Sequence, residues 1–180
     1  MLEILTIIYL FYGYLFLFSS IHKLKDMEKH YNAVILYEII PKQFTRVFIW
    51  LETVFEFFIG ISFLLSFATS YVIIGAILLL MIYSIAIVVN ITKGRINLDC
   101  GCGGLVGTHK LSKNLVSRNI LLIFVLVIVF IVQPFSLFAI AFDYKFFLMH
   151  SAYLLVILVT FTSKEMFDLK QNIKILTKEE

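Results

Sequence analysis

The two cysteines of this 180-residue chain lie one residue apart, in the stretch LDCGCGG at residues 98–104. Cys100 and Cys102 can form a disulfide only if the backbone bends, because the two Cα atoms must come within roughly 4.4–6.8 Å. Gly101 permits this bend, since glycine adopts backbone angles that other residues avoid. A strained disulfide of this kind is readily reduced, which is typical of catalytic or regulatory pairs. The spacing therefore favours Cys100 and Cys102 as a reversible redox pair.

The neighbours of the cysteine pair leave other interpretations open. Arg95, His109 and Lys110 are close in sequence and would stabilise the reactive thiolate form. In one alternative, the cysteines are small apolar side chains that simply bury well. In another, they bind a metal together with His109 and Asp99, but this spacing fits known zinc patterns poorly. We therefore expect no metal site.

Glu52 and Glu56 form a second group, because residues four apart share one face of a helix. They lie in a long apolar segment, where an acid at the bilayer centre costs about 2.5–3.5 kcal/mol, so they should face the interior of a helical bundle. We expect them either to handle protons or to bond a bound headgroup such as a quinone. The alternative is that they are neutral acids that join helices to one another. His150 would extend a polar path if the chain were a small transporter.

The composition places these residues in a membrane. Hydrophobic residues make up 61% of the chain, charged residues 15%, and the mean hydropathy is +0.99. Such values lie outside the range of soluble domains. We expect an all-α integral membrane bundle, since only helices or closed barrels satisfy their backbone in lipid and these segments lack the alternation of a barrel.

The expected organisation is a single polytopic domain over residues 1–180. Five apolar segments are long enough to span a bilayer, near residues 4–21, 44–67, 71–91, 120–142 and 146–162. The cysteine loop covers 92–119, an amphipathic interfacial helix covers 27–41, and a tail covers 163–180. The first segment lacks the basic start and the cleavage site of a signal peptide, so we expect it to be a permanent span.

The basic residues predict the orientation of the chain. Five lie in the first connection, five in the third, four in the tail, and only Lys145 in the fourth. By the positive-inside rule, the N-terminus faces outward and the C-terminus inward in the cell membrane. The net charge of +3 is then explained by topology and anionic membrane lipid, and we expect no nucleic-acid partner.

Several short motifs follow one another along the first two thirds of the chain. They are SSIHKLKD at the end of the first span, IIP at the end of the amphipathic stretch, E-x₇-G from Glu52 to Gly60, DCGCGG, and S-R-N ending at Arg118 and Asn119. Their order and spacing resemble the MauE branch of the DoxX-like membrane proteins. The resemblance implies a four-helix core with one further helix. It also implies redox chemistry linked to maturation of methylamine dehydrogenase with thioredoxin-like partners, and quinone coupling in DoxX-like relatives. One departure is Gly103, where the family often has an aromatic residue.

The resemblance implies that this chain is a redox-associated membrane protein. If it is an enzyme, the class it implies is a thiol-disulfide oxidoreductase. Cys100 and Cys102 match the redox pair, while Glu52, Arg118 and Asn119 match motif positions without an assigned role. The alternative function is a non-enzymatic subunit or scaffold that stabilises a partner complex. One conflict stays open, because disulfide formation belongs to the oxidising outer side, whereas the charge pattern puts the cysteine loop inside.

Overall fold

The computed structural model describes residues 2–65, 70–95, 98, 111–132, 148, 151–153, 155, 156 and 159. The chain divides into two compact units, Met1–Phe138 and Ala139–Glu180, which are described separately. In the second unit the described residues are helical, and Ser151 Oγ donates a hydrogen bond to the Leu148 carbonyl at 2.9 Å. The expected fifth span and tail lie largely outside the described residues, and so do Cys100, Cys102 and His150. The single-domain organisation stays a prediction.

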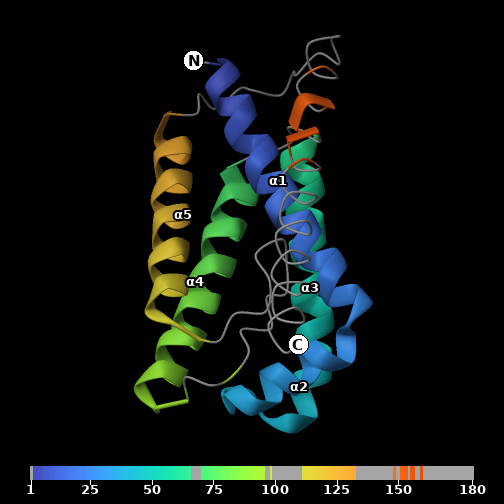
Figure 1. Cartoon of the computed structure of the whole chain (residues 1–180), viewed down its shortest axis with the longest axis vertical. Helices are drawn as coiled ribbons and strands as arrows, with labels where there is room; N and C mark the ends of the chain where they lie inside the picture. Colours follow the sequence, from blue (N-terminus) through green and yellow to red (C-terminus); the bar gives the residue numbers. More distant parts are fainter. Residues whose placement is uncertain are drawn as a thin grey trace, which may run out of the picture. The chain divides into compact units, whose positions relative to one another are not determined.

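The first unit consists of helices α1 (Leu2–Lys25), α2 (Met27–Tyr37), α3 (Lys42–Leu64), α4 (Ser70–Thr92) and α5 (Lys113–Val132) (Figure 1). Four of them, all but the short α2, are long and apolar enough to cross a membrane. The part of the chain that the structure describes contains helices and no strands. The prediction of an all-α membrane bundle is confirmed.

The helix bounds follow the apolar segments, with one clear difference. α5 begins at Lys113, whereas the span was expected from residue 120 and the cysteine loop until 119. Leu115 and Asn119 are both buried on the inner face of this early part of α5. The helix therefore starts before its hydrophobic run does, because its first turns also have a face to bury.

The packing of α1 against α3 depends on a close approach of their backbones. A Cβ atom added at Gly60 of α3 would lie 2.8 Å from the backbone nitrogen of Leu17 in α1 and 3.2 Å from the carbonyl oxygen of Gly13. Small residues at such crossings allow helices to pack closely in lipid, where apolar burial alone does not drive helix association. This contact fixes the register in which α1 and α3 face each other.

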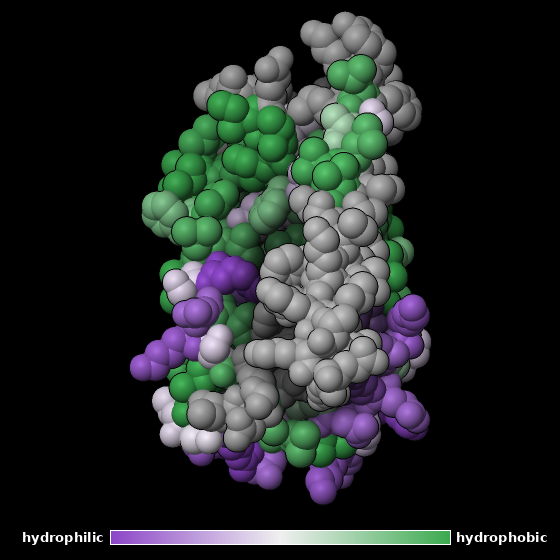
Figure 2. Space-filling view, in the orientation of Figure 1, coloured by the Kyte–Doolittle hydropathy of each residue, from purple (hydrophilic) through white to green (hydrophobic). Residues whose placement is uncertain are grey.

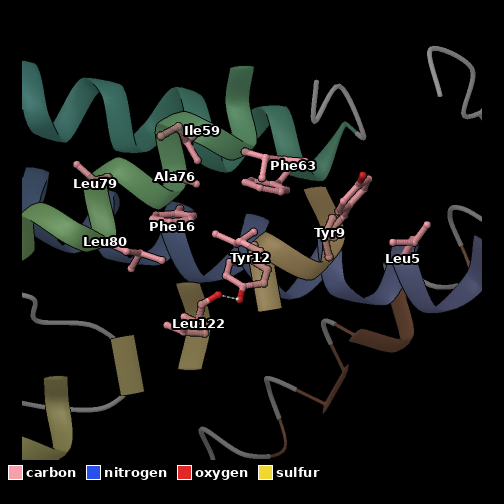
Figure 3. Packing of buried hydrophobic residues seen from close by; sticks show 13 residues of the cluster. Leu5, Tyr9, Tyr12, Phe16, Ile59, Phe63, Ala76, Leu79, Leu80 and Leu122 are labelled. Carbon is pink, nitrogen blue, oxygen red and sulfur yellow. Dashed lines mark hydrogen bonds between the residues drawn. The ribbon is translucent and has the colours of Figure 1, made fainter. Parts of the chain in front are cut away.

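Aromatic side chains fill the apolar core between these helices (Figure 3). The ring of Phe63 lies 5.7 Å from that of Tyr9 and 5.8 Å from that of Tyr12, measured between centroids. The hydroxyl of Tyr12 donates a hydrogen bond of 2.7 Å to the backbone carbonyl of Leu122 in α5, as Figure 3 shows. This bond ties α1 to α5 inside the apolar core.

The short helix α2 lies at the end of the unit where α1 and α4 end and where α3 and α5 begin (Figure 1). Its buried residues are His30, Ala33 and Tyr37. Hydrophilic residues gather at this end, while the opposite half of the visible surface is mostly hydrophobic (Figure 2). The helices of the first unit thus have a polar end and an apolar body, as expected of a bundle that passes through a bilayer.

Two contacts hold α2 in place at the polar end. The Arg95 guanidinium, just after α4, donates hydrogen bonds to the Leu36 carbonyl at 3.2 Å and to the carboxylate of Glu38. Tyr37 packs in a small apolar cluster with Ile87 of α4 and Leu115 of α5. α2 is therefore attached to the α4–α5 pair as well as to its sequence neighbours.

Candidate functional site

A buried lysine lies at the centre of the polar group inside the bundle. The Lys23 ammonium, in the last turn of α1, is 2.5 Å from Glu52 Oε1 and 2.7 Å from Glu56 Oε2. It also donates a hydrogen bond of 2.7 Å to the hydroxyl of Tyr83. Lys23 is only 1% exposed, Glu52 6% and Glu56 2%. Lysine and glutamate are almost never this buried unless they are paired. These contacts therefore offset the cost of removing the three charged groups from water, and loss of one partner would destabilise the fold.

Two further side chains complete the group around Glu52. His30 Nε2 is 2.9 Å from Glu52 Oε2, and the Tyr83 hydroxyl donates a hydrogen bond to Glu52 Oε1. The Lys23 ammonium also lies 4.5 Å from the centroid of the Tyr83 ring. Lys23, His30, Glu52, Glu56 and Tyr83 are called the buried network below. Four helices contribute to the buried network, namely α1, α2, α3 and α4.

The sequence explains why these side chains meet. Glu52 and Glu56 lie on the buried face of α3, about 15 and 21 Å along the helix from Lys42 at a rise of 1.5 Å per residue. The close contact at Gly60 sets α1 so that its last turn faces these two carboxylates. Because α1 ends at Lys25, the chain turns into α2, and His30 comes to lie beside the first half of α3.

The charges of the buried network do not balance without an additional proton. With both acids and Lys23 ionised and His30 neutral, the network carries one net negative charge. One more proton, on a carboxylate or on the imidazole, brings the net charge of the network to zero. Burial favours zero net charge, because an unpaired charge is costly away from water. Nδ1 of His30 is buried and has no hydrogen-bond partner among the described residues. The arrangement can therefore bind and release a single proton through several short contacts.

Arg118 and Asn119 lie on α5 at the level of the buried network. Two apolar clusters lie on either side of this level: Leu80 and Leu122 belong to one, and Ile87 and Leu115 belong to the other. Tyr83 of α4 and Asn119 of α5 both fall between these clusters. Arg118 Nη2 donates to Asn119 Oδ1 at 3.4 Å, and the buried Nε of Arg118 has no partner within the described parts of the chain. Among the described residues, no hydrogen bond or ion pair joins Arg118 or Asn119 to Glu52 or Glu56.

Both ends of the segment that carries Cys100 and Cys102 meet at one point of the bundle. The Leu111 backbone N–H donates a hydrogen bond of 3.0 Å to the Leu98 carbonyl. Leu111 is buried in the cluster of Tyr37, and Leu98 packs against that cluster. Leu98 and Leu111, which flank residues 99–110 in the sequence, therefore lie together at the polar end of the bundle, next to α2.

The sequence analysis identified the two acids but missed most of their partners. Lys23 was grouped with the basic residues that set the topology, and neither His30 nor Tyr83 was singled out. One signal was present, because acids within spans are normally paired and Lys23 is one of three basic residues at the end of the neighbouring span. His30 and Tyr83 carry no such signal, since their roles depend on how α2 and α4 pack.

Comparison with known proteins agrees with the motif order. The family described as methylamine utilisation protein MauE matches residues 1–132. A methylamine utilization protein MauE from Paracoccus denitrificans is 26% identical over 113 residues, covering 63% of this chain and 61% of that protein. One of the same name from Methylorubrum extorquens is 29% identical over 101 residues, covering 56% of this chain and 54% of that protein.

The aligned regions thus span little more than half the length of these two relatives. No solved structure matches the chain. The family match extends from the first residue through α5 and includes every member of the buried network. On this evidence the chain belongs to the MauE family of membrane proteins.

Proposed function

We propose that this protein takes part in thiol–disulfide electron transfer during methylamine utilisation, with Cys100 and Cys102 as a reversible redox pair. The client is a partner protein that must acquire or rearrange disulfides, and a thioredoxin-like protein is the exchange partner. The relatives' names support the pathway, and the paired thiols support the chemistry.

The observation that carries this proposal is the closed base of the cysteine segment. Leu98 is bonded to Leu111 at the polar end of the bundle. Cys100 follows Leu98 by two residues, so the covalent chain keeps the Cα of Cys100 within about 7 Å of the Cα of Leu98. In the sequence, Arg95 precedes the segment and Arg118 follows it, and the guanidinium of Arg95 also bonds the Glu38 carboxylate. Positive charge near a thiol favours the thiolate, which is the form that attacks a disulfide.

The exchange step needs no reactant beyond the two proteins. The thiolate of one cysteine attacks a disulfide of the thioredoxin-like partner, and a mixed disulfide forms as one partner thiolate leaves. The second cysteine then displaces the remaining partner sulfur. Cys100 and Cys102 end as a disulfide and the partner ends with two thiols, so two electrons and two protons have moved to the partner.

The buried network would serve this chemistry as a reservoir for one proton. Glu52 is bonded to Lys23 and His30, so its carboxylate is already engaged within the protein. This arrangement supports proton handling more directly than contact with a quinone. The assignment of Glu52, Glu56, Arg118 and Asn119 to quinone binding stays a prediction, for which the unpartnered Nε of Arg118 offers a donor.

The test combines thiol trapping with a functional readout. Cells are quenched with acid, free thiols are blocked, disulfides are reduced, and the newly exposed thiols are labelled with a maleimide that shifts the protein on a gel. We expect a mixture of oxidised and reduced protein in the wild type. Cys100→Ser and Cys102→Ser should each insert normally and abolish maturation of the client dehydrogenase.

Ser112→Ala, a change in the same connection outside the cysteine pair, is the matched control and should leave maturation intact. Full maturation in both cysteine variants would refute the redox proposal. In that case the scaffold function would apply, and substitutions in α2 should reduce maturation instead.

A further inference from the structure

A pocket lies at the polar end of the bundle, between α2 and the first turns of α3. Its wall from α2 contains Glu28, Tyr31 and Asn32, and its wall from α3 contains Arg46 and Trp50. These side chains include a carboxylate, a guanidinium, an amide and two aromatic rings. Such a combination is suited to a ligand that carries charge at one end and apolar groups at the other.

The two charges of this pocket are not neutralised by each other. No ion pair joins Glu28 to Arg46, although both are described and both line the pocket. The Arg46 guanidinium lies 5.8 Å from the centroid of the Tyr31 ring, which holds it against the pocket wall without occupying its hydrogen-bond donors. A ligand with both an anionic and a cationic group would satisfy both residues at once.

The position of the pocket indicates which class of ligand reaches it. Trp50 lies one helical turn beyond Arg46 and is 51% exposed, and Val54 and Phe58 continue the exposed apolar surface along α3. Tryptophan is enriched at the membrane–water interface, where one part of the ring is apolar and the other is wet. The pocket therefore lies at the depth of lipid headgroups, with an apolar path for acyl chains leading away from it.

We propose that this pocket binds the headgroup of an aminophospholipid such as phosphatidylethanolamine. Arg46 holds the phosphate by charge-assisted hydrogen bonds, which its planar group is suited to make. Glu28 accepts hydrogen bonds from the primary ammonium, and Asn32 offers a further polar group at the rim. The acyl chains pass over Trp50 toward Phe58. This site lies apart from the buried network and does not depend on the proposed redox function.

The experiment measures lipid binding to the purified full chain in detergent by native mass spectrometry. The protein is titrated separately with phosphatidylethanolamine, phosphatidylglycerol and phosphatidylcholine of identical acyl chains. We expect the first to bind about tenfold more tightly than the second, the difference that one charge-assisted hydrogen bond produces. Phosphatidylcholine should also bind more weakly, because its ammonium has no hydrogen to donate.

Matched variants connect the binding to the two charges. Arg46→Gln should weaken phosphatidylethanolamine binding about tenfold, and Glu28→Gln should remove the preference over phosphatidylglycerol. Lys42→Gln and Asp26→Asn remove like charges from the same two helices outside the pocket and should bind as the wild type does. If Arg46→Gln does not fold, Arg46→Lys provides a second variant, with a smaller loss expected.

Two results would overturn the proposal. One is equal affinity of the wild type for phosphatidylethanolamine and phosphatidylglycerol. The other is equal lipid binding by Arg46→Gln and Lys42→Gln. A competition arm uses soluble glycerophosphoethanolamine, and we expect it to displace the lipid only at far higher concentration. Displacement at equal concentration would identify a free phosphate ester as the ligand and would refute the assignment to a lipid.

Discussion

Replacement of Lys23 by methionine is the most direct test of the buried network. Methionine keeps the length and most of the volume of lysine but removes the ammonium that contacts Glu52, Glu56 and Tyr83. The two carboxylates then remain buried without the cation between them. Among the described residues, His30, bonded to Glu52 at 2.9 Å, is the one basic side chain left in contact with them.

The size of the effect follows from the burial of the pair. Removing one partner of a buried ion pair typically costs 3–5 kcal/mol, because the remaining charge is left uncompensated. Lys23 is 1% exposed, so little solvent is present to reduce this cost. At about 2–4 °C per kcal/mol for a chain of this size, Lys23→Met should lower the melting temperature by roughly 6–20 °C.

The assay is thermal unfolding of the purified protein in detergent, followed by circular dichroism. Lys25→Met is the matched control, since Lys25 lies in the same turn of α1 and is exposed. A triple variant with Lys23→Met, Glu52→Gln and Glu56→Gln should recover much of the loss, because it leaves no unpaired charge in the network. The deficit of Lys23→Met should also shrink as the pH falls, since the two acids can then take up protons.

A melting temperature of Lys23→Met within about 2 °C of that of Lys25→Met, below the change expected for 1 kcal/mol, would refute this reasoning. It would mean that the ammonium does not lie between the carboxylates in the folded protein. A triple variant as unstable as Lys23→Met would show instead that the side chains matter for packing and not for charge.

Three further predictions concern the contacts that hold the bundle together. Gly60→Leu should prevent α1 from packing on α3 and lower the yield of folded protein severely, as measured by size-exclusion chromatography, because its Cβ alone would overlap the α1 backbone. Tyr12→Phe should cost about 1 kcal/mol in thermal unfolding, since it removes one buried hydrogen bond to the Leu122 carbonyl. The hydrogen bond from Arg95 holds the pKa of Glu38 below its usual value of 4.5, so this contact stabilises α2 above pH 4.5 and is lost as the pH falls through the lowered pKa. The protection of the α2 amides against hydrogen exchange, taken relative to the intrinsic exchange rate at each pH, should therefore fall in acid for the wild type and not for Glu38→Gln.

Each of these predictions has an outcome that contradicts it. Normal folding of Gly60→Leu, at the level of a Ser62→Leu control on the same helix, would exclude the close approach of α1 and α3. A Tyr12→Phe protein as stable as the wild type would mean that water or another donor replaces the lost bond. Equal acid sensitivity in the wild type and Glu38→Gln would assign the effect to a different acid.

The main features of the fold follow from the sequence because they depend on local hydrophobicity. Four long helices appear where apolar runs of spanning length occur, and Pro41 separates α2 from α3. The start of α5 was harder to predict, since Lys113 and Arg118 make its first turns polar although Leu115 is buried. The sequence does not indicate which side of α2 is buried, because that depends on its partners in α3, α4 and α5.

The buried network could be predicted only in part, for a similar physical reason. Glu52 and Glu56 can be recognised in the sequence because an acid within an apolar span is costly to insert and is therefore usually paired or functional. Tyr83 gives no comparable signal, since tyrosine is common in membrane helices and its role depends on the rotation of α4. His30 contributes only because α2 folds back against α3.

The pairing of Lys23 with acids 29 and 33 residues later has a consequence for biosynthesis. At about 5–20 residues per second, roughly 1.5–6 s pass between synthesis of Lys23 and synthesis of Glu52. During this interval the ammonium must stay in water or at the headgroups, which its position near the end of α1 allows. The first helix can therefore reach its final depth only after the third has entered the membrane, so the two are expected to leave the insertion machinery together.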